Sequence, residues 1–495
     1  MKRVINMPGI RSMEADSTSA NQNMSYERLQ ETLSDCGQEH LLQFWPSLSP
    51  EGRQRLSGQL SAVDWSMVES WLDRYVKHQP ELNLPSDLRP APSLPAEPGD
   101  DRQRSLYENA IERGRQLLRE GRVAGFTVAG GQGTRLGYEG PKGTFPISPV
   151  RGKSLFQWFA ESLLRAREKY EAAIPWYIMT SPLNDGQTRD FFERNNYFGL
   201  PSTEVFLFPQ GVMPVIGLDG RFLLSAPDQL AVSPDGHGGS LLALRQSEAL
   251  ADMARRGIDC ISYWQIDNPL VHIFDPLFIG MHQQTGSEMS CRGLVKTGPL
   301  EKLGNFCLVD GRVSIVEYSD MPERLARMTD EQGRLIFRIG SPAIHLLSRS
   351  FVERLTEGGK LALPFHRAVK KVPFVNSDGE QVEPDAPNAV KLETFIFDAL
   401  PLADQVLILE AVREEQFAPV KNRTGVDSVE SCRHLMQERA ARWLEAAGIP
   451  VPRSEDRGLG CQLELSPRAF LDPDDVRRRA SQIQPPQSGN KEYYE

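Results

Sequence analysis

The chain has 495 residues, of which 40% are hydrophobic and 25% charged, and this composition is typical of a globular protein with two or three domains. The formal net charge of -10 argues against a nucleic-acid partner but permits a local basic pocket for a small phosphorylated ligand. No stretch approaches 18 apolar residues, and the first ten residues are a poor signal peptide, so we expect no membrane partner and a cytoplasmic location.

Four regions follow one another along the chain. Residues 1–105 show helical spacing and end in a Pro-rich linker, with five prolines among the 18 residues of "LPSDLRPAPSLPAEPGDD". Residues 106–400 alternate between strand-like and helical patterns and form the predicted catalytic domain. Residues 401–482 are mainly helical and predict a smaller C-terminal lobe, and the polar residues 483–495 predict a disordered tail.

The alternation predicts an α/β fold with a doubly wound, mostly parallel, Rossmann-like sheet covered by helices on both faces. Its clearest strands are the buried runs "VAGFTVAGG", "IPWYIMTS", "EVFLFPQG" and "IDCISYWQID". Ligands of such sheets bind beyond the carboxyl ends of the strands, so the loops that follow these runs are the candidate binding sites. The six cysteines are scattered without zinc-ligand spacing and read as reduced packing thiols.

The first of these runs leads into "GGQGTRLGYEGPKGTFPI". Glycines without side chains allow backbone N–H groups to approach an anion or a base, and Arg135 and Lys142 can add positive charge. The spacing also suits an ordinary tight turn with solvated charges. It matches neither G-x-x-x-x-G-K-[ST] nor G-x-G-x-x-G, so a P-loop ATPase or an NAD-dependent oxidoreductase fits less well than another kind of nucleotide site.

The longer pattern A-G-G-x-G-T-R-L-G followed by P-K is more specific. Together with "FFERNNYFGL", "FPQGVMP", "SPDGHGG", "IDNPLV", "VEYSD", "NAVKLETFIFD" and "FAPVKN", it resembles the UDP-N-acetylhexosamine pyrophosphorylases and UDP-sugar uridylyltransferases of the UDPGP type 1 family, from about residue 105 to 445. The resemblance implies a uridylyltransferase, a nucleotidyltransferase of the EC 2.7.7 type. In its reaction the phosphate oxygen of a sugar 1-phosphate attacks the α-phosphorus of UTP and pyrophosphate leaves.

The resemblance also implies roles for individual residues. Arg135, Lys142 and Lys421 match catalytic positions. Asp267 matches the aspartate associated with a divalent cation, Mg²⁺ or Mn²⁺. The UTP-binding positions comprise Val128, Ala129, Gly130, Gly131, Lys142, Gln210, Gly236, Asp267 and Lys391. The sugar-phosphate positions comprise His237, Gly304, Glu317, Tyr318, Ser341 and Lys421.

Two residues depart from the N-acetylhexosamine pattern. His237 and Ser341 each stand where asparagine is usual, so glucose 1-phosphate and galactose 1-phosphate join N-acetylglucosamine 1-phosphate as expected substrates. The alternative function is a nucleotide-binding regulator that has lost catalysis. Arg135, Lys142, Asp267 and Lys421 argue against it, because a decayed site usually loses such charged residues.

Overall fold

The structure is a computed structural model that describes residues 24–78, 84–85, 87–456 and 458–495. The chain forms two compact units, each described by itself below. The smaller unit contains the N-terminal residues to Pro80 with the later segments Met213–Ser233 and Arg367–Lys391, and the larger unit contains the rest. These two segments lie inside the range predicted as one catalytic domain, so the units divide the chain differently. Residues 1–23, 79–83 and 86 of the predicted N-terminal region, including its first ten residues, lie outside the described residues.

The smaller unit combines N-terminal helices with short strands from the later segments. Serines 25 and 49 cap the first two helices, since each hydroxyl accepts a backbone N–H three residues on. The Gln38 side chain donates to the carbonyl of Gly220 at 3.0 Å and accepts from the N–H of Phe222 at 2.8 Å. A side chain near the N-terminus thus holds a turn 182 residues away. The main elements are α1 (Tyr26–Asp35), α2 (Pro50–Ser61), α3 (Val68–Trp71), β6 (Ile216–Gly217), β7 (Leu224–Ala226), β8 (Gln229–Leu230), β16 (His366–Lys370), β17 (Phe374–Val375), β18 (Gln381–Val382) and β19 (Ala389–Glu393).

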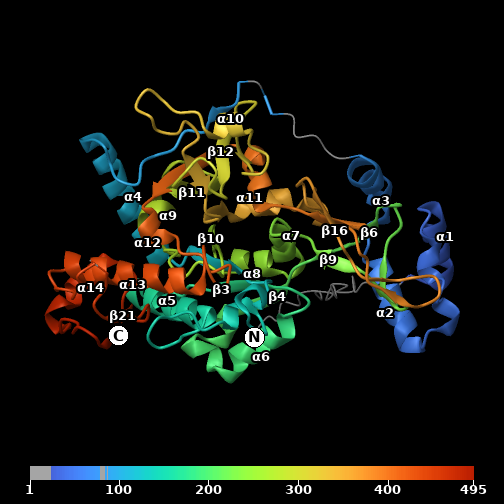
Figure 1. The fold of residues 1–495 in the computed structure, drawn as a ribbon, viewed down its shortest axis with the longest axis horizontal. Helices are drawn as coiled ribbons and strands as arrows, with labels where there is room; N and C mark the ends of the chain where they lie inside the picture. Colours follow the sequence, from blue (N-terminus) through green and yellow to red (C-terminus); the bar gives the residue numbers. More distant parts are fainter. Residues whose placement is uncertain (1–23, 79–83, 86, 457) are drawn as a thin grey trace, which may run out of the picture. The chain divides into compact units, whose positions relative to one another are not determined.

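The larger unit is built on an eleven-stranded sheet (Figure 1). Its order is β1-β12-β14-β11-β15-β10-β2-β3-β4, with β13 paired to β12 and β20 paired to β11. The strands are β1 (Arg89–Pro90), β2 (Val123–Val128), β3 (Trp176–Thr180), β4 (Val205–Pro209), β10 (Cys260–Gln265), β11 (Met289–Val295), β12 (Gly304–Val309), β13 (Arg312–Val316), β14 (Ile339–Ser341), β15 (His345–Ser348) and β20 (Val406–Ala411). The predicted α/β class is confirmed. Strands β10, β2, β3 and β4 are parallel, whereas most pairings beyond β10 are antiparallel.

Helices cover both faces of the parallel strands, as a doubly wound sheet requires. Side chains of β3 alternate between the two faces: Trp176 and Ile178 enter one hydrophobic core, and Tyr177 and Met179 enter the other. The first core is closed by α4 (Asp101–Arg119), α5 (Leu155–Tyr170) and α9 (Pro276–Gln284). The second is closed by α7 (Gly239–Gln246), α8 (Ala249–Arg255) and α11 (Arg349–Leu355). Helix α6 (Asp185–Arg194) also packs on the first core, whereas α10 (Glu323–Ala326) belongs to a separate small core with β12 and β13. Helix α12 (Arg413–Gln416) follows β20.

Helices α4 and α9 touch backbone to backbone. A Cβ atom added at Gly114 of α4 would lie 1.9 Å from the carbonyl oxygen of Pro276, and one added at Gly280 of α9 would lie 1.7 Å from that of Ala110. Glycine at both positions therefore sets the close approach of the two helices. Their contact fixes one wall of the first core beside β2 and β10.

The C-terminal lobe has a small core of its own, formed by α13 (Val429–Ala446), β21 (Gln462–Leu465) and α14 (Pro473–Arg479). The last residues differ from the predicted disordered tail, because Lys491–Tyr494 form strand β22, which pairs in parallel with β21. The Tyr493 hydroxyl also accepts a hydrogen bond from Lys153 Nζ at 2.9 Å. The polar composition of the segment does not predict this strand, because the segment is held by contacts with residues far away in the sequence.

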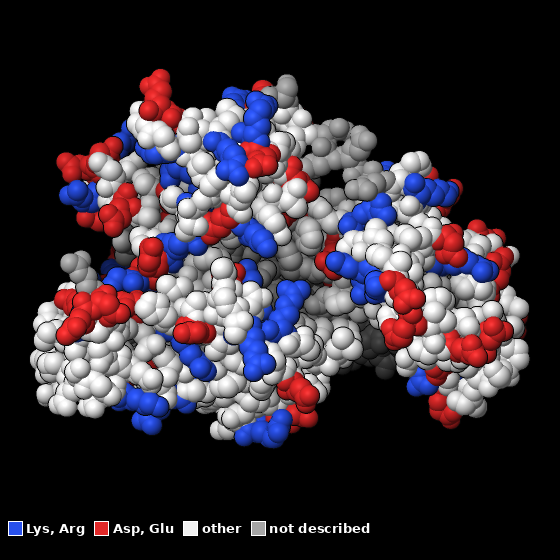
Figure 2. Space-filling model, in the orientation of Figure 1, with Lys and Arg blue, Asp and Glu red and all other residues white. Residues whose placement is uncertain are grey.

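No helix among the described residues is long and apolar enough to cross a membrane. Acidic and basic side chains are interspersed over the face of the molecule drawn in Figure 2. The net negative charge is therefore not gathered into one acidic patch on that face.

Candidate functional site

The loop after β2 is bare where a ligand would approach. At Gly131 nothing lies within 4 Å of the position that a Cβ atom would take, so its backbone borders open space. At Gly130 a Cβ atom would lie 2.5 Å from Oε1 of Gln210, which follows β4. At Gly133 it would lie 2.7 Å from the ring of Tyr138. Side chains at these positions would displace the Gln210 amide or distort the loop.

The same loop folds back so that Lys142 lies beside the glycines. The N–H of Gly133 donates to the carbonyl of Gly140 at 2.9 Å, and the N–H of Lys142 donates to the carbonyl of Gly131 at 3.0 Å. Gly140 has a φ of +134°, a conformation that other residues rarely adopt. The separation of eleven residues between the glycine pair and the lysine is therefore the length of one closed loop.

Lys142 meets Asp267 at the carboxyl edge of the sheet. Strands β2 and β10 pair in parallel with Val128 opposite Gln265, so the residues that follow the two strands are neighbours. The Lys142 Nζ atom donates to Asp267 Oδ2 at 3.0 Å, and the two side chains are only 15% and 13% exposed. A lysine and a carboxylate are thus held together next to the bare loop.

The segment that carries Lys421 is fixed to the same place. The carbonyl of Asp267 accepts the N–H of Val420 at 2.8 Å. The Asn268 side chain accepts the N–H of Ala418 at 3.0 Å and donates to the carbonyl of Gln416 at 2.8 Å. Lys421 itself is 41% exposed and lies 3.7 Å from a carboxylate oxygen of Asp427.

A cavity of about 170 Å³ opens beyond Asp267. Its wall includes the ends of β10, β12 and β14 and the segment with Lys421. It brings together six predicted residues: His237, Asp267, Gly304, Glu317, Ser341 and Lys421. It also includes residues that the sequence analysis missed, among them Lys302, Phe397 and Phe417. Phe397 and Phe417 lie within the quoted motifs "NAVKLETFIFD" and "FAPVKN", but a motif does not tell which of its side chains faces a cavity, and Lys302 lies in none of the quoted motifs.

His237 presents a neutral ring to this cavity. Its Nδ1 accepts the N–H of Ile396 at 3.2 Å, and its ring stacks on Phe395 with 5.1 Å between the centroids. Burial, and then the charge of His366, lowers the pKa of His237 to about 4. Since Nδ1 is an acceptor in the neutral ring, the proton resides on Nε2, which is left as a donor.

The ionisable side chains His366 and Glu317 also have shifted pKa values. His366 stacks on Phe395 at 4.3 Å, and its Nε2 is 2.8 Å from a carboxylate oxygen of Asp398. Burial opposes protonation of His366, but the hydrogen bond and charge of Asp398 outweigh it and raise the pKa of His366. Burial, followed by the charge of Asp320, raises the pKa of Glu317. The cavity therefore offers an imidazole donor, a carboxylate and a lysine to a polar ligand.

The other predicted residues lie outside the wall of this cavity. Tyr318 is 45% exposed and is absent from the cavity wall, although Glu317 beside it is present. Arg135 is exposed and has no ion-pair partner among the described residues. Lys391 lies on β19, at the end of a segment of the smaller unit. Gly236 has a φ of +85°, and a Cβ atom there would lie 2.3 Å from the carbonyl oxygen of Thr394.

Asp267 is the only predicted metal ligand. Within the part of the chain that the structure describes, no group of three or more His, Cys, Asp or Glu side chains could hold a metal ion. A single carboxylate nevertheless suits Mg²⁺, which is commonly bound by one or two carboxylates together with substrate phosphates. The donor set therefore fits a cation that arrives with a phosphorylated ligand.

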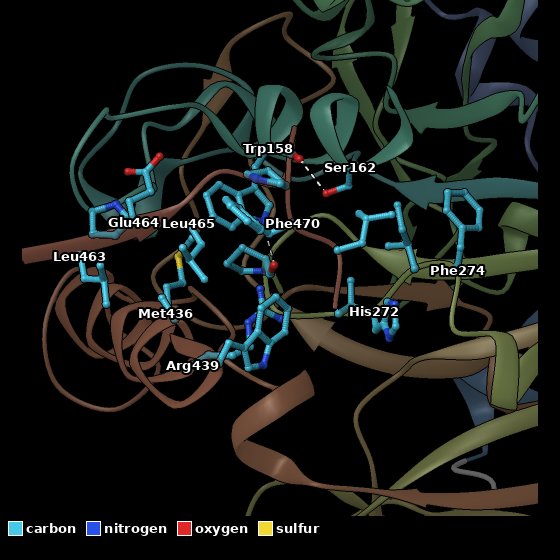
Figure 3. Close-up of a pocket in the computed structure, with 18 residues that line it drawn as sticks. Trp158, Ser162, His272, Phe274, Met436, Arg439, Leu463, Glu464, Leu465 and Phe470 are labelled. Carbon is cyan, nitrogen blue, oxygen red and sulfur yellow. Dashed lines mark hydrogen bonds between the residues drawn. The ribbon is translucent and has the colours of Figure 1, made fainter. Parts of the chain in front are cut away.

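A second cavity, drawn in Figure 3, lies against the C-terminal lobe. Trp158 and Ser162 of α5 and Met436 and Arg439 of α13 contribute to its wall. Its volume of about 40 Å³ has room for a few water molecules. It is too small for a nucleotide or a sugar phosphate, so the larger cavity next to Asp267 is the candidate site.

A family model, curated proteins and solved structures that match the chain all describe uridylyltransferases, pyrophosphorylases or diphosphorylases. A family model described as UTP--glucose-1-phosphate uridylyltransferase matches residues 93–460. The chain is 35% identical over 432 residues to UDP-N-acetylhexosamine pyrophosphorylase-like protein 1 of Homo sapiens, covering 84% of this chain and 85% of that protein. It is 35% identical over 439 residues to UDP-N-acetylglucosamine diphosphorylase 2 of Arabidopsis thaliana, covering 86% of each. The crystal structure of the uridine diphosphate N-acetylglucosamine pyrophosphorylase of Trypanosoma brucei in complex with inhibitor matches with a TM-score of 0.77 at 26% identity, covering 93% of this chain and 96% of that one.

Proposed function

The chain belongs to the UTP--glucose-1-phosphate uridylyltransferase family and is a nucleotidyltransferase, and from this premise we propose that it converts UTP and an N-acetylhexosamine 1-phosphate to a UDP-sugar and pyrophosphate. The choice of sugar rests on the names of the relatives, which specify N-acetylhexosamine or N-acetylglucosamine. Glucose and galactose 1-phosphates are the competing substrates that the experiment below includes.

One observation carries the proposal. Asp267 is hydrogen-bonded through its side chain to Lys142 of the glycine loop and through its carbonyl to Val420, the residue before Lys421. A nucleotide phosphate held at the loop and a sugar phosphate held in the cavity would therefore meet at Asp267. This is the requirement of a reaction between two anions, which depends on alignment and charge neutralisation rather than on a covalent intermediate.

The reaction needs little from the protein beyond these positions. An oxygen of the sugar phosphate forms a bond to the α-phosphorus of UTP, and the bond from that phosphorus to the pyrophosphate oxygen breaks. Lys142 and Arg135 neutralise charge on the UTP phosphates and the departing pyrophosphate, while Lys421 holds the sugar phosphate. A divalent cation, Mg²⁺ or Mn²⁺, held by Asp267 would neutralise further phosphate charge when bound.

His237 supports an N-acetylated sugar despite replacing the usual asparagine. Its Nε2–H is a neutral donor, as an asparagine amide is, and can bind the carbonyl oxygen of an acetamido group. Ser341, also in the cavity wall, has a shorter polar side chain than asparagine and leaves more room. The pair thus preserves a donor while enlarging the cavity.

A substrate panel tests the proposal. The protein is incubated with UTP and Mg²⁺ and, separately, with the 1-phosphates of N-acetylglucosamine, N-acetylgalactosamine, glucose and galactose, and pyrophosphate release is measured. We expect the highest kcat/KM with an N-acetylated sugar. A higher value with glucose or galactose 1-phosphate would overturn the sugar assignment. Binding of UTP without pyrophosphate release from any mixture would instead support a nucleotide-binding regulator.

A further inference from the structure

The Gln210 side chain lies at the glycine loop, and its Oε1 atom is available to accept a hydrogen bond from a ligand. Its backbone N–H donates to the carbonyl of Thr180 at 2.9 Å, which anchors the residue at the end of β4. Gln210 is 9% exposed, and its Oε1 would lie 2.5 Å from a Cβ atom added at Gly130. Within the described residues, no group of the protein donates a hydrogen bond to this Oε1.

The other end of the same amide meets a buried carboxylate. Gln210 Nε2 donates to Asp235 Oδ1 at 3.4 Å. Asp235 is 9% exposed and closely packed, since Cβ atoms added at Gly211 and Gly239 would lie 2.5 and 2.2 Å from its carboxylate oxygens. An ionised carboxylate only accepts hydrogen bonds, so it can pair with the NH₂ end of the amide but not with the oxygen end.

We propose that Asp235 fixes the orientation of the Gln210 amide so that Oε1 faces the nucleotide base, and that this orientation selects uracil over cytosine. Uracil carries an N–H at N3 and can donate to an acceptor. Cytosine carries a lone pair at N3 and would face Oε1 with a repulsive contact. Asp235 is a positioning residue in this arrangement, because it acts through Gln210 and does not itself touch the base.

The alternative orientation of Gln210 has a clear cost. Turning the amide by 180° would place Oε1 against the Asp235 carboxylate, where two acceptors would lie without a proton between them. Burial raises the pKa of Asp235 to about 6, so the carboxylate is ionised at pH 8. The backbone carbonyl of Asp235 separately accepts the N–H of Thr394 at 2.7 Å, a contact that a change of its side chain leaves in place.

The Asp235→Asn variant tests this inference, which rests on the proposed use of UTP. Asparagine has the same shape, but its amide can either donate or accept, so Gln210 is free to turn. At pH 8 with Mg²⁺ and the preferred sugar phosphate, we expect the ratio of kcat/KM for UTP to that for CTP to fall about tenfold. A change in overall packing would lower both values together and leave this ratio unchanged.

A matched control is Asp185→Asn, which alters another aspartate close to the same loop. Asp185 accepts from the Thr180 hydroxyl at 2.6 Å and pairs with Arg189, and within the described residues it has no hydrogen bond to the Gln210 side chain. Thr180 holds Gln210 through its backbone carbonyl, which the substitution leaves in place. Its UTP-to-CTP ratio should equal that of the unmodified protein. An unchanged ratio in Asp235→Asn would overturn the assignment of Asp235.

Nucleotide binding separates the possible failures. Calorimetric titration with UTP and CTP, without sugar phosphate, measures base selection even if a protein has no turnover. A wild-type protein that binds UTP no better than CTP would overturn both the inference and the use of UTP. A wild-type protein that prefers UTP in binding but releases no pyrophosphate would contradict only the proposed reaction. In that case the same binding ratio in Asp235→Asn would decide the role of Asp235.

Discussion

Lys142 and Asp267 are 125 residues apart in the chain, yet their side chains are hydrogen-bonded. We expect Lys142→Ala to lower kcat at least about 100-fold, because a charge aimed at the reacting phosphates is lost. Steady-state pyrophosphate release measures the effect, and a thermal melt checks that the fold is kept. Arg104→Ala on the exposed face of α4 is the control and should leave the rate unchanged. A near-normal rate for Lys142→Ala would contradict the role of this lysine.

Single residues also show what the sequence could and could not predict about the site. Gly130 and Lys142 belong to a short loop motif, and Asp267 follows directly after a strand, so local patterns mark all three residues. The structure brings these two places together. Asp235 was missed although it precedes Gly236 in the same motif, because its contact with Gln210 depends on how two loops pack. Tyr318 was predicted with Glu317, but the pattern does not tell which of two neighbouring side chains faces the cavity.

Among the elements, the buried parallel strands were the most predictable. Strands β2, β3 and β10 correspond to continuous apolar runs, since both of their faces are covered, and the partly buried edge strand β4 is apolar as well. The antiparallel half was not predicted, because strands such as β12 and β14 are short or partly exposed and are paired by distant contacts. A strand that is buried on both faces appears in the sequence as a run of apolar residues, whereas no such pattern gives the order of the strands in the sheet.

The contact between α4 and α9 gives a prediction in which packing opposes helix propensity. Alanine favours a helix over glycine by about 1 kcal/mol, but a Cβ atom at position 114 would lie 1.9 Å from the carbonyl oxygen of Pro276. We expect Gly114→Ala to lower the free energy of unfolding by about 2–4 kcal/mol, because the two helices must separate. Denaturation in urea provides the measurement.

A matched substitution isolates the packing effect. Gly186 lies in α6 with nothing within 4 Å of its Cβ position, so Gly186→Ala changes helix propensity alone. Its free energy of unfolding should stay equal or rise by less than about 1 kcal/mol. Equal stability of the Gly114→Ala and Gly186→Ala variants would show that α4 and α9 do not constrain each other.

At the scale of the whole molecule, the C-terminal residues are part of the fold. Strand β22 pairs with β21, and Tyr493 is one of three side-chain groups that accept hydrogen bonds from Lys153 Nζ, with Glu161 and Ser466. Deleting residues 488–495 removes both interactions, and we expect the melting temperature to fall by at least about 3 °C. Differential scanning fluorimetry measures the change. Tyr493→Phe keeps the strand and should have a smaller effect, and an unchanged melting temperature in the deletion would contradict a structural role.

The division into units could not be predicted from the sequence for a related reason. Segments Met213–Ser233 and Arg367–Lys391 contain only short strands and turns, which carry no strong periodic pattern, and their membership of the smaller unit depends on contacts such as those of Gln38. Local periodicity identifies an element but does not identify the core that the element joins.

The smaller unit is assembled from three separated pieces of chain, and this affects its synthesis. Its helices α1 and α2 are made early, but the segment ending at Lys391 follows more than 300 residues later. At ribosomal rates of about 5–20 residues per second, those helices wait about 15–60 s for the strands that complete their core. During that interval their apolar faces are available to chaperones or to other nascent chains, so we expect the yield of folded protein to depend on the rate of translation.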